Sequence, residues 1–127
     1  MATVFLQASN NALSTLAATL AAGATAVNID DITNMPGSFP FRLTIWDAAT
    51  YGYTNAADDP NMEIVEVTGW SGAYYYPYTP AQTEYTILRA REGTADVEHA
   101  SGQTIALLIT AGMIQQIQDA ITALEGP

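Results

Sequence analysis

His99 is the only histidine of the chain, and three side chains close to it in sequence could join it in acid–base or nucleophilic chemistry: Asp96, Glu98 and Ser101. A serine nucleophile needs a sharp elbow of the Gly-x-Ser-x-Gly type, because that strained turn lifts the hydroxyl into the site. The chain instead has Ala-Ser-Gly at residues 100–102. We therefore expect no enzyme, and a small hydrolase centred on His99 is the weakest alternative.

A metal or cofactor site also lacks the residues that it would need. Protein zinc sites combine several thiolate, imidazole or carboxylate ligands, whereas this chain has no cysteine and a single histidine. Asp58 and Asp59, beside Asn55 and Asn61, offer oxygen atoms for calcium, but the twelve-residue calcium loop pattern is absent. We interpret this cluster as a solvated turn and predict neither a metal nor a cofactor.

Arg89 and Arg91 are two of only three basic residues, and they stand two positions apart at the end of an expected strand. That spacing would place both side chains on one side of the strand. The chain has 13 carboxylates and a net charge of -10, and the planar guanidinium pairs well with carboxylates. We expect both arginines to form ion pairs, within the protein or across an interface between copies, rather than to contact a separate partner.

His99 lies on a long connector between two apolar runs rich in β-branched residues, 85–88 and 104–109, which are typical of strands. We predict that this connector is an ordered structural crossover. Gly93 would supply a turn with positive φ, and Thr94 a bond from its side chain to the backbone. The ring nitrogens of His99 would tie the crossover to backbone carbonyl and amide groups.

Five residues of this region form a pattern in which an Arg ends a strand, a Gly-Thr turn follows, and a His and a further Gly precede the next strand. They are Arg89, Gly93, Thr94, His99 and Gly102, with support from Phe39-Pro40 ahead of an earlier strand. In this pattern the chain resembles a small β domain of tailed-bacteriophage virion proteins. Ala90 departs from it by standing where Gly is usual, which would displace the tight turn toward Gly93, and Asp96 replaces a small apolar residue.

The resemblance implies a structural protein of the virion, assembled in the host cytoplasm. It implies a tail or baseplate adaptor whose copies join as a trimer or ring, contact other virion proteins and attach a fibre. A capsid decoration or head-fibre base protein is the alternative within the virion.

The composition bounds the class of protein. With 127 residues, 49% of them hydrophobic, the chain has room for one domain with one core. Only 13% of its residues are charged, so neutral groups must cover much of the surface, which suits burial against other subunits. The net charge of -10 would repel a phosphate backbone, so we expect no direct contact with nucleic acid. No apolar run approaches the roughly 20 residues of a membrane helix, and we expect no membrane contact.

Short apolar runs separated by Gly and Pro turns predict a mostly β fold, a small antiparallel β sandwich or barrel with a C-terminal α-helix. The expected strands are residues 24–29, 41–46, 62–68, 85–88 and 104–109. A bulge or a strand end is expected near Val65, because Glu63 and Glu66 fall on opposite faces. Residues 47–61 and 70–83 interrupt the pattern as long loops.

Residues 13–22 allow two interpretations. Leu13, Leu16 and Leu20 have helical spacing, and the alanines between them favour a helix. The phage resemblance instead implies an extended segment that pairs with the next strand across a turn at Gly23. We favour the strand, because tertiary pairing overrides local propensity.

Residues 110–124 form a helix by local rules, with Thr110 able to cap the start and Gly126-Pro127 able to stop it. Four apolar residues with spacing 3, 4, 3 line one seam, namely Ile114, Ile117, Ile121 and Leu124. Ile at both seam positions favours coiled coils of three or four strands. We divide the chain into a β domain, residues 1–109, and a helix, residues 110–127, for assembly; alternatively, the seam packs on the chain's own sheet.

The densest aromatic patch consists of Trp70, Tyr74, Tyr75, Tyr76 and Tyr78. Such side chains offer large, rigid contact areas with a polar tip and are common at recognition surfaces. The patch could contact a partner protein or stack on a glycan, so a carbohydrate-binding module is the alternative from another class. Equally, the rings could simply cover an edge of the sheet.

Overall fold

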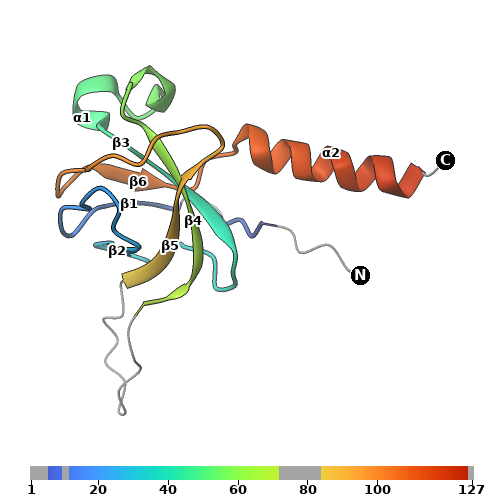
Figure 1. Cartoon of the computed structure of the whole chain (residues 1–127), viewed down its shortest axis with the longest axis horizontal. Coiled ribbons are helices and arrows are strands. Elements are labelled where there is room, and N and C mark those ends of the chain that lie inside the picture. Colours follow the sequence, from blue (N-terminus) through green and yellow to red (C-terminus); the bar gives the residue numbers. More distant parts are fainter. Residues whose placement is uncertain (1–5, 10–11, 72–83, 126–127) are drawn as a thin grey trace, which may run out of the picture.

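The fold is mostly β, as predicted, and consists of one antiparallel sheet with a C-terminal helix. The computed structural model describes residues 6–9, 12–71 and 84–125. The strands are β1 (Leu13–Thr15), β2 (Ala26–Asn28), β3 (Phe41–Trp46), β4 (Glu63–Trp70), β5 (Glu84–Arg91) and β6 (Thr104–Ala106). They lie in the order β1-β6-β3-β4-β5-β2 and curl into a half-barrel, from which helix α2 (Ala111–Glu125) projects (Figure 1).

The two edge strands of the curled sheet are tied to each other. Leu16, just after β1, forms an antiparallel bridge with Ile29, just after β2. The amide of Ala17 also donates to the carbonyl of Asn28 at 2.9 Å. This pairing overrides the helix propensity of the alanines that follow β1, so the extended interpretation of this segment is confirmed.

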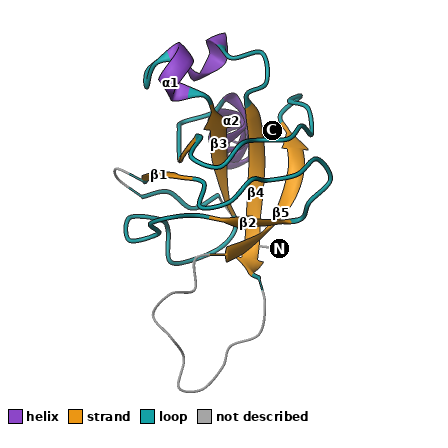
Figure 2. Ribbon diagram, turned by 90° about the vertical axis from the view of Figure 1, so that its left-hand side faces the viewer, coloured by secondary structure: helices purple, strands orange, loops and turns teal. Residues whose placement is uncertain are grey.

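The main hydrophobic core lies on the inner face of the curled sheet. Alternate residues of β3 point into it, as the sequence pattern predicts. Phe41, Leu43 and Ile45 of β3 are fully buried, and so are Tyr85 of β5 and Ile105 of β6. Since successive residues of a strand point to opposite faces, the remaining β3 side chains lie on the outer face. Figure 2 shows how the strands wrap around this core, with α2 seen end-on behind them.

Residues 47–61, predicted as an irregular loop, are partly helical. They contain α1 (Ala48–Tyr51) and η1 (Ala56–Asp58). Both cover the outer face at Trp46, which packs against Ala48 and Ala56 and donates from its indole N–H to the carbonyl of Gly52 at 2.9 Å. The sequence pattern missed these short helices because their burial against Trp46 is a tertiary contact.

The register between β4 and β5 shifts in mid-strand. Ile64 pairs with Arg91, but Glu66 pairs with Leu88, so one residue of β4 faces two residues of β5. Of the two outcomes predicted near Val65, the bulge is confirmed, with its extra residue in β5, and the strand end is wrong, because β4 continues to Trp70. The bulge lies beside Ala90, whose backbone φ is 54°.

The chain leaves the sheet sooner than predicted on its way to α2. The strand expected at residues 104–109 ends at Ala106, and the amide of Leu107 donates to the carbonyl of Ala12 at 2.9 Å. Ile109 is 79% exposed. In the described part of the chain, no helix combines the length and the apolar character needed to cross a membrane.

Candidate functional site

Glu63 at the start of β4 is a completely buried carboxylate, and sequence reasoning did not connect it with the crossover. Arg89 holds both oxygens, with Nε 2.8 Å from Oε2 and Nη2 2.9 Å from Oε1. His99 Nε2 lies 2.8 Å from Oε1, and the amide of Ala90 donates to Oε2 at 3.0 Å. A buried carboxylate is costly unless its charge is paired and its oxygens accept hydrogen bonds, and these groups meet both conditions.

The surroundings of Glu63 keep it ionised. Burial by itself raises the pKa of the carboxyl, but the hydrogen bonds from Arg89 and His99, the amide of Ala90 and the charge of Arg89 outweigh burial and lower the pKa to about 2. Because Glu63 is then an acceptor only, Nε2 of His99 is the donor in their hydrogen bond.

Arg89 joins three segments that are far apart in sequence. Its Nη1 donates to the carbonyls of Ala21 and Ala24 at 2.8 and 3.0 Å. Its Nη2 donates to the carbonyl of Val97 at 2.7 Å. The guanidinium therefore connects the end of β5, the turn before β2 and the crossover, which matches the predicted role of Arg89 in an ion pair within the protein.

His99 has the predicted structural position but different partners. Its ring was expected to bind backbone groups, whereas Nε2 contacts the side chain of Glu63 and Nδ1 lies 3.2 Å from Oε1 of Gln103. The backbone of His99, not its ring, pairs with Leu20, through hydrogen bonds of 2.8 and 2.9 Å. The residue is 1% exposed, so both ring nitrogens are engaged inside the domain.

The two departures from the phage pattern have specific roles. The tight turn lies at Glu92-Gly93, as predicted, with φ of 54° and 82° and the amide of Thr94 donating to the carbonyl of Arg91 at 3.1 Å. Ala90, whose amide donates to the buried carboxylate, also adopts φ 54°. Asp96 accepts from the amide of Gly23 at 2.8 Å, and the same oxygen is 3.0 Å from Nη2 of Arg89. The polar residue at position 96 therefore fixes the turn before β2 to the crossover.

The remaining crossover residues behave as predicted. Gly93 and Gly102 have φ of 82° and 90°, values that favour glycine. The Thr94 hydroxyl donates to the carbonyl of Arg91 at 2.8 Å and accepts from the amide of Ile64 at 3.0 Å. The crossover is thus an ordered element that is bonded to both β4 and β5.

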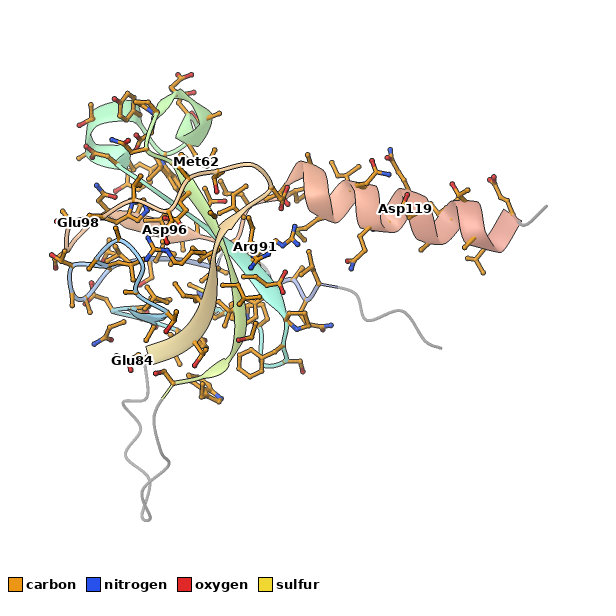
Figure 3. The ribbon with its side chains drawn as sticks, viewed as in Figure 1. Met62, Glu84, Arg91, Asp96, Glu98 and Asp119 are labelled. Carbon is orange, nitrogen blue, oxygen red and sulfur yellow. The ribbon has the colours of Figure 1, made fainter. Side chains whose placement is uncertain are left out.

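Arg91 does not form the ion pair that was predicted for it within the described residues. The bulge interrupts the alternation of β5, so Arg89 and Arg91 do not share one environment. Nε of Arg91 is buried and has no hydrogen-bond partner in the described part of the chain. Figure 3 places Arg91 at the end of β5, near the base of α2.

Glu92, which no sequence pattern had indicated, holds the start of α2. Its carboxylate accepts from the amide of Gly112 and from the hydroxyl of Thr110, both at 2.6 Å, and it is 2.9 Å from Nη1 of Arg42. Arg42 Nε also binds Glu66 at 3.0 Å. We call the group of Arg42, Glu92, Thr110 and Gly112 the helix clamp. Thr110 Oγ1 also accepts from the amide of Met113 at 3.3 Å, which confirms its predicted capping role.

The helix clamp also explains the pKa of Glu92 and why position 112 is glycine. Burial acts to raise the pKa of Glu92, but the hydrogen bonds from Thr110 and Gly112 and the charge of Arg42 outweigh burial and lower the pKa. A Cβ atom on Gly112 would lie 2.6 Å from both Arg42 Nη1 and Glu92 Cδ. Only glycine lets the carboxylate approach the helix amide this closely.

We expect Gly112→Ala to destabilise the protein by about 1–2 kcal/mol, because it separates a charged hydrogen-bond acceptor from the helix start. Without the clamp, the same substitution in a helix would stabilise by up to about 1 kcal/mol. The free energy of urea unfolding and the hydrogen exchange of the α2 amides measure the effect. Gly37→Ala is the control, since a Cβ atom there meets nothing within 4 Å. Stabilisation by Gly112→Ala would contradict the clamp.

The α2 seam is exposed, and none of the described residues of the helix is buried. The exposed fractions are 46% for Ile114, 53% for Ile117, 50% for Ile121 and 88% for Leu124. The helix projects from the β domain instead of lying on it (Figure 1), so the alternative in which the seam packs on the chain's own sheet is wrong.

Two further sites predicted from the sequence are the aromatic patch around Trp70 and the cluster at Asp58 and Asp59. Trp70 is half-buried and stacks on Tyr85 with ring centroids 4.7 Å apart, so it extends the core. Tyr74, Tyr75, Tyr76 and Tyr78 lie outside the described residues.

Asp59 is buried, not solvated as predicted, and accepts from the amides of Asp47 and Asn61 at 2.8 Å each. Nowhere in residues 6–9, 12–71 and 84–125 do three His, Asp or Glu side chains gather as metal ligands.

No protein-family model and no curated protein sequence matches this chain. Two polar clusters characterise the structure. Arg89, Glu63 and His99 connect segments of the curled β domain, and the helix clamp holds the projecting helix α2 to that domain.

Proposed function

We propose that the protein is a structural assembly protein without catalytic activity, in which α2 joins copies of the chain. The observation that carries this proposal is the projection of α2 with four exposed apolar residues on one seam, while its start is fixed by charged hydrogen bonds. A helix of this length is only marginally stable alone in water, so a partner that covers the seam would stabilise it.

The size of the exposed seam supports this role. Burying a fully exposed Ile or Leu side chain contributes roughly 1.5–3 kcal/mol. Three seam residues are about half exposed and Leu124 is 88% exposed, so covering the seam contributes on the order of 5 kcal/mol per chain. That contribution, repeated in each copy of an oligomer, can offset the loss of freedom on association.

We further propose that the assembly belongs to a bacteriophage virion, as a tail or baseplate adaptor that attaches a fibre. The support is the resemblance of the crossover, together with the structural roles that its residues have in this fold. Arg89 and His99 converge on one buried carboxylate, and Gly93, Thr94 and Gly102 shape the connection between β5 and β6. The same features support a capsid decoration or head-fibre base protein equally, and the location on the particle would distinguish the two. Trp70 gives little support to a carbohydrate-binding module, because it stacks inside the domain.

We expect the full chain to sediment as an oligomer and Ile117→Glu to sediment as a monomer, with self-association weakened roughly a hundredfold. The physical reason is the loss of an apolar contact and the burial of a charge in the seam. Ala123→Glu is the matched control, because it adds the same charge on another face of the helix and should remain oligomeric. Sedimentation velocity measures both variants. Equal sedimentation of Ile117→Glu and wild type would contradict assembly through α2.

The virion assignment has its own test. Purified particles of the phage that encodes this chain should contain it, and gold-labelled antibody should mark the tail or baseplate. Labelling of the capsid would favour the decoration alternative. Absence from particles, combined with turnover of an ester or glycoside by the monomer, would overturn the proposal.

A further inference from the structure

We propose that the partners of the α2 seam are the α2 helices of two further copies, arranged as a parallel, in-register three-stranded coiled coil. This inference rests on the self-association proposed above and names its arrangement. The spacing of the seam assigns Ile114 and Ile121 to the a positions of a heptad, and Ile117 and Leu124 to the d positions. Ile at both a and d, as in Ile114 and Ile117, shifts the preference from two strands to three or four. Ile121 with Leu124 is the pairing common in two strands, so the first heptad is what favours three.

The charges on α2 suit copies of itself better than a foreign helix. Asp119 and Glu125 are the only charged residues of Ala111–Glu125, so they carry two of the ten net negative charges of the chain. Asp119 is far from the seam in the heptad, and Figure 3 shows it along the projecting part of the helix. In a parallel coil the g residues of one helix face the e residues of the next, which here sets Ala120 against Glu125 and creates no like-charge pair.

The flanks of the seam argue against recognition of a basic partner helix. Such a partner would be selected by acidic e and g residues along the length of the seam. The g positions beside the seam instead hold Met113 and Ala120, and the e positions hold Gln118 and Glu125, so only the last of the four is charged. Flanks with so little charge let identical helices of an acidic protein approach one another.

The base and the tip of α2 differ, and this difference favours the parallel direction. At the base, the amide of Leu6 donates to Oε1 of Gln116 at 2.9 Å, and both residues line a pocket with Met113 and Ile117. The chain therefore already covers one flank there, whereas Leu124 at the tip is 88% exposed. A parallel arrangement sets tip against tip, so the most exposed residue of each copy meets its equivalents.

The test uses the complete chain, which contains no cysteine, so that a single introduced thiol is unique. Native mass spectrometry should give about 40 kDa, three times the chain mass of 13.5 kDa. On mild oxidation, Leu124→Cys should form a disulfide between copies in most molecules, because three d residues of one layer meet at the axis. Ala123→Cys, which points away from the seam, should cross-link at least tenfold less.

The possible results distinguish the parallel trimer from the broader proposal that α2 joins copies of the chain. A dimer mass, or cross-linking of Leu124→Cys only when it is mixed with Ile114→Cys, would overturn the parallel trimer and leave self-association through α2 intact. A monomer mass at all salt concentrations would overturn both. Added salt should strengthen a parallel trimer, because it screens the repulsion between acidic β domains that lie at the same end; weakening by salt would count against it.

Discussion

Arg89→Met is expected to lower the free energy of unfolding by about 3–5 kcal/mol, because it leaves the charge of Glu63 buried without its counterion. Glu63 is fully buried, and the side chain of Arg89 is only 6% exposed, so water cannot replace the guanidinium without opening the domain. The backbone carbonyls of Ala21, Ala24 and Val97 would lose their donor as well. Urea denaturation followed by tryptophan fluorescence measures the change.

Arg91→Met is the matched control for Arg89→Met, because it makes the same substitution two residues further along β5. Nε of Arg91 has no hydrogen-bond partner among the described residues, so its removal should change the unfolding free energy by less than about 1 kcal/mol. Equal losses in the two variants would show that the buried pair with Glu63 is not what stabilises the domain.

Acidification should remove the contribution of Glu63 to stability. Its pKa is about 2 in the folded protein, against an ordinary value of 4.5, so the folded state favours the ionised carboxyl. That stabilisation is fully present above pH 4.5 and is lost as the pH falls toward 2. The linked free energy is about 3 kcal/mol, to be measured as the unfolding free energy in urea at a series of pH values.

Two variants test which carboxyl group causes this pH dependence. Glu63→Gln is expected to be less stable than wild type at neutral pH, but its stability should fall less between pH 4.5 and 2, because the titrating group is gone. Glu92 also has a lowered pKa and contributes in the same direction, so Glu92→Gln should remove a different, smaller part of the slope. If the slope of Glu63→Gln equalled that of wild type, Glu63 would not be the group that titrates.

The elements that could be predicted from the local sequence are those whose sequence signal lies within a few residues. The alternation of β3 and the seam of α2 each recur at the period of their own backbone, so they could be recognised without knowledge of neighbours. The Gly93-Thr94 turn was likewise predicted correctly, because its bonds join residues close in sequence.

Partners far apart in sequence could not be predicted in the same way. Glu63 is 26 residues from Arg89 and 36 from His99, and only the pairing of β4 with β5 brings them together. The same holds for Glu92, which meets Gly112 across 20 residues. A break in alternation near Val65 was predicted from β4 alone, but only the pairing places the extra residue in β5, where it separates the environments of Arg89 and Arg91.

The sequence by itself determined that this is a small acidic β domain followed by an amphipathic helix, because composition and periodicity are properties of the chain alone. Only the tertiary structure decided which carboxylate is buried, which arginine pairs with it, and that α2 leaves its seam open. Those outcomes depend on which strands pair and in what register, since burial and ion pairing are set by distances between segments that local sequence does not encode.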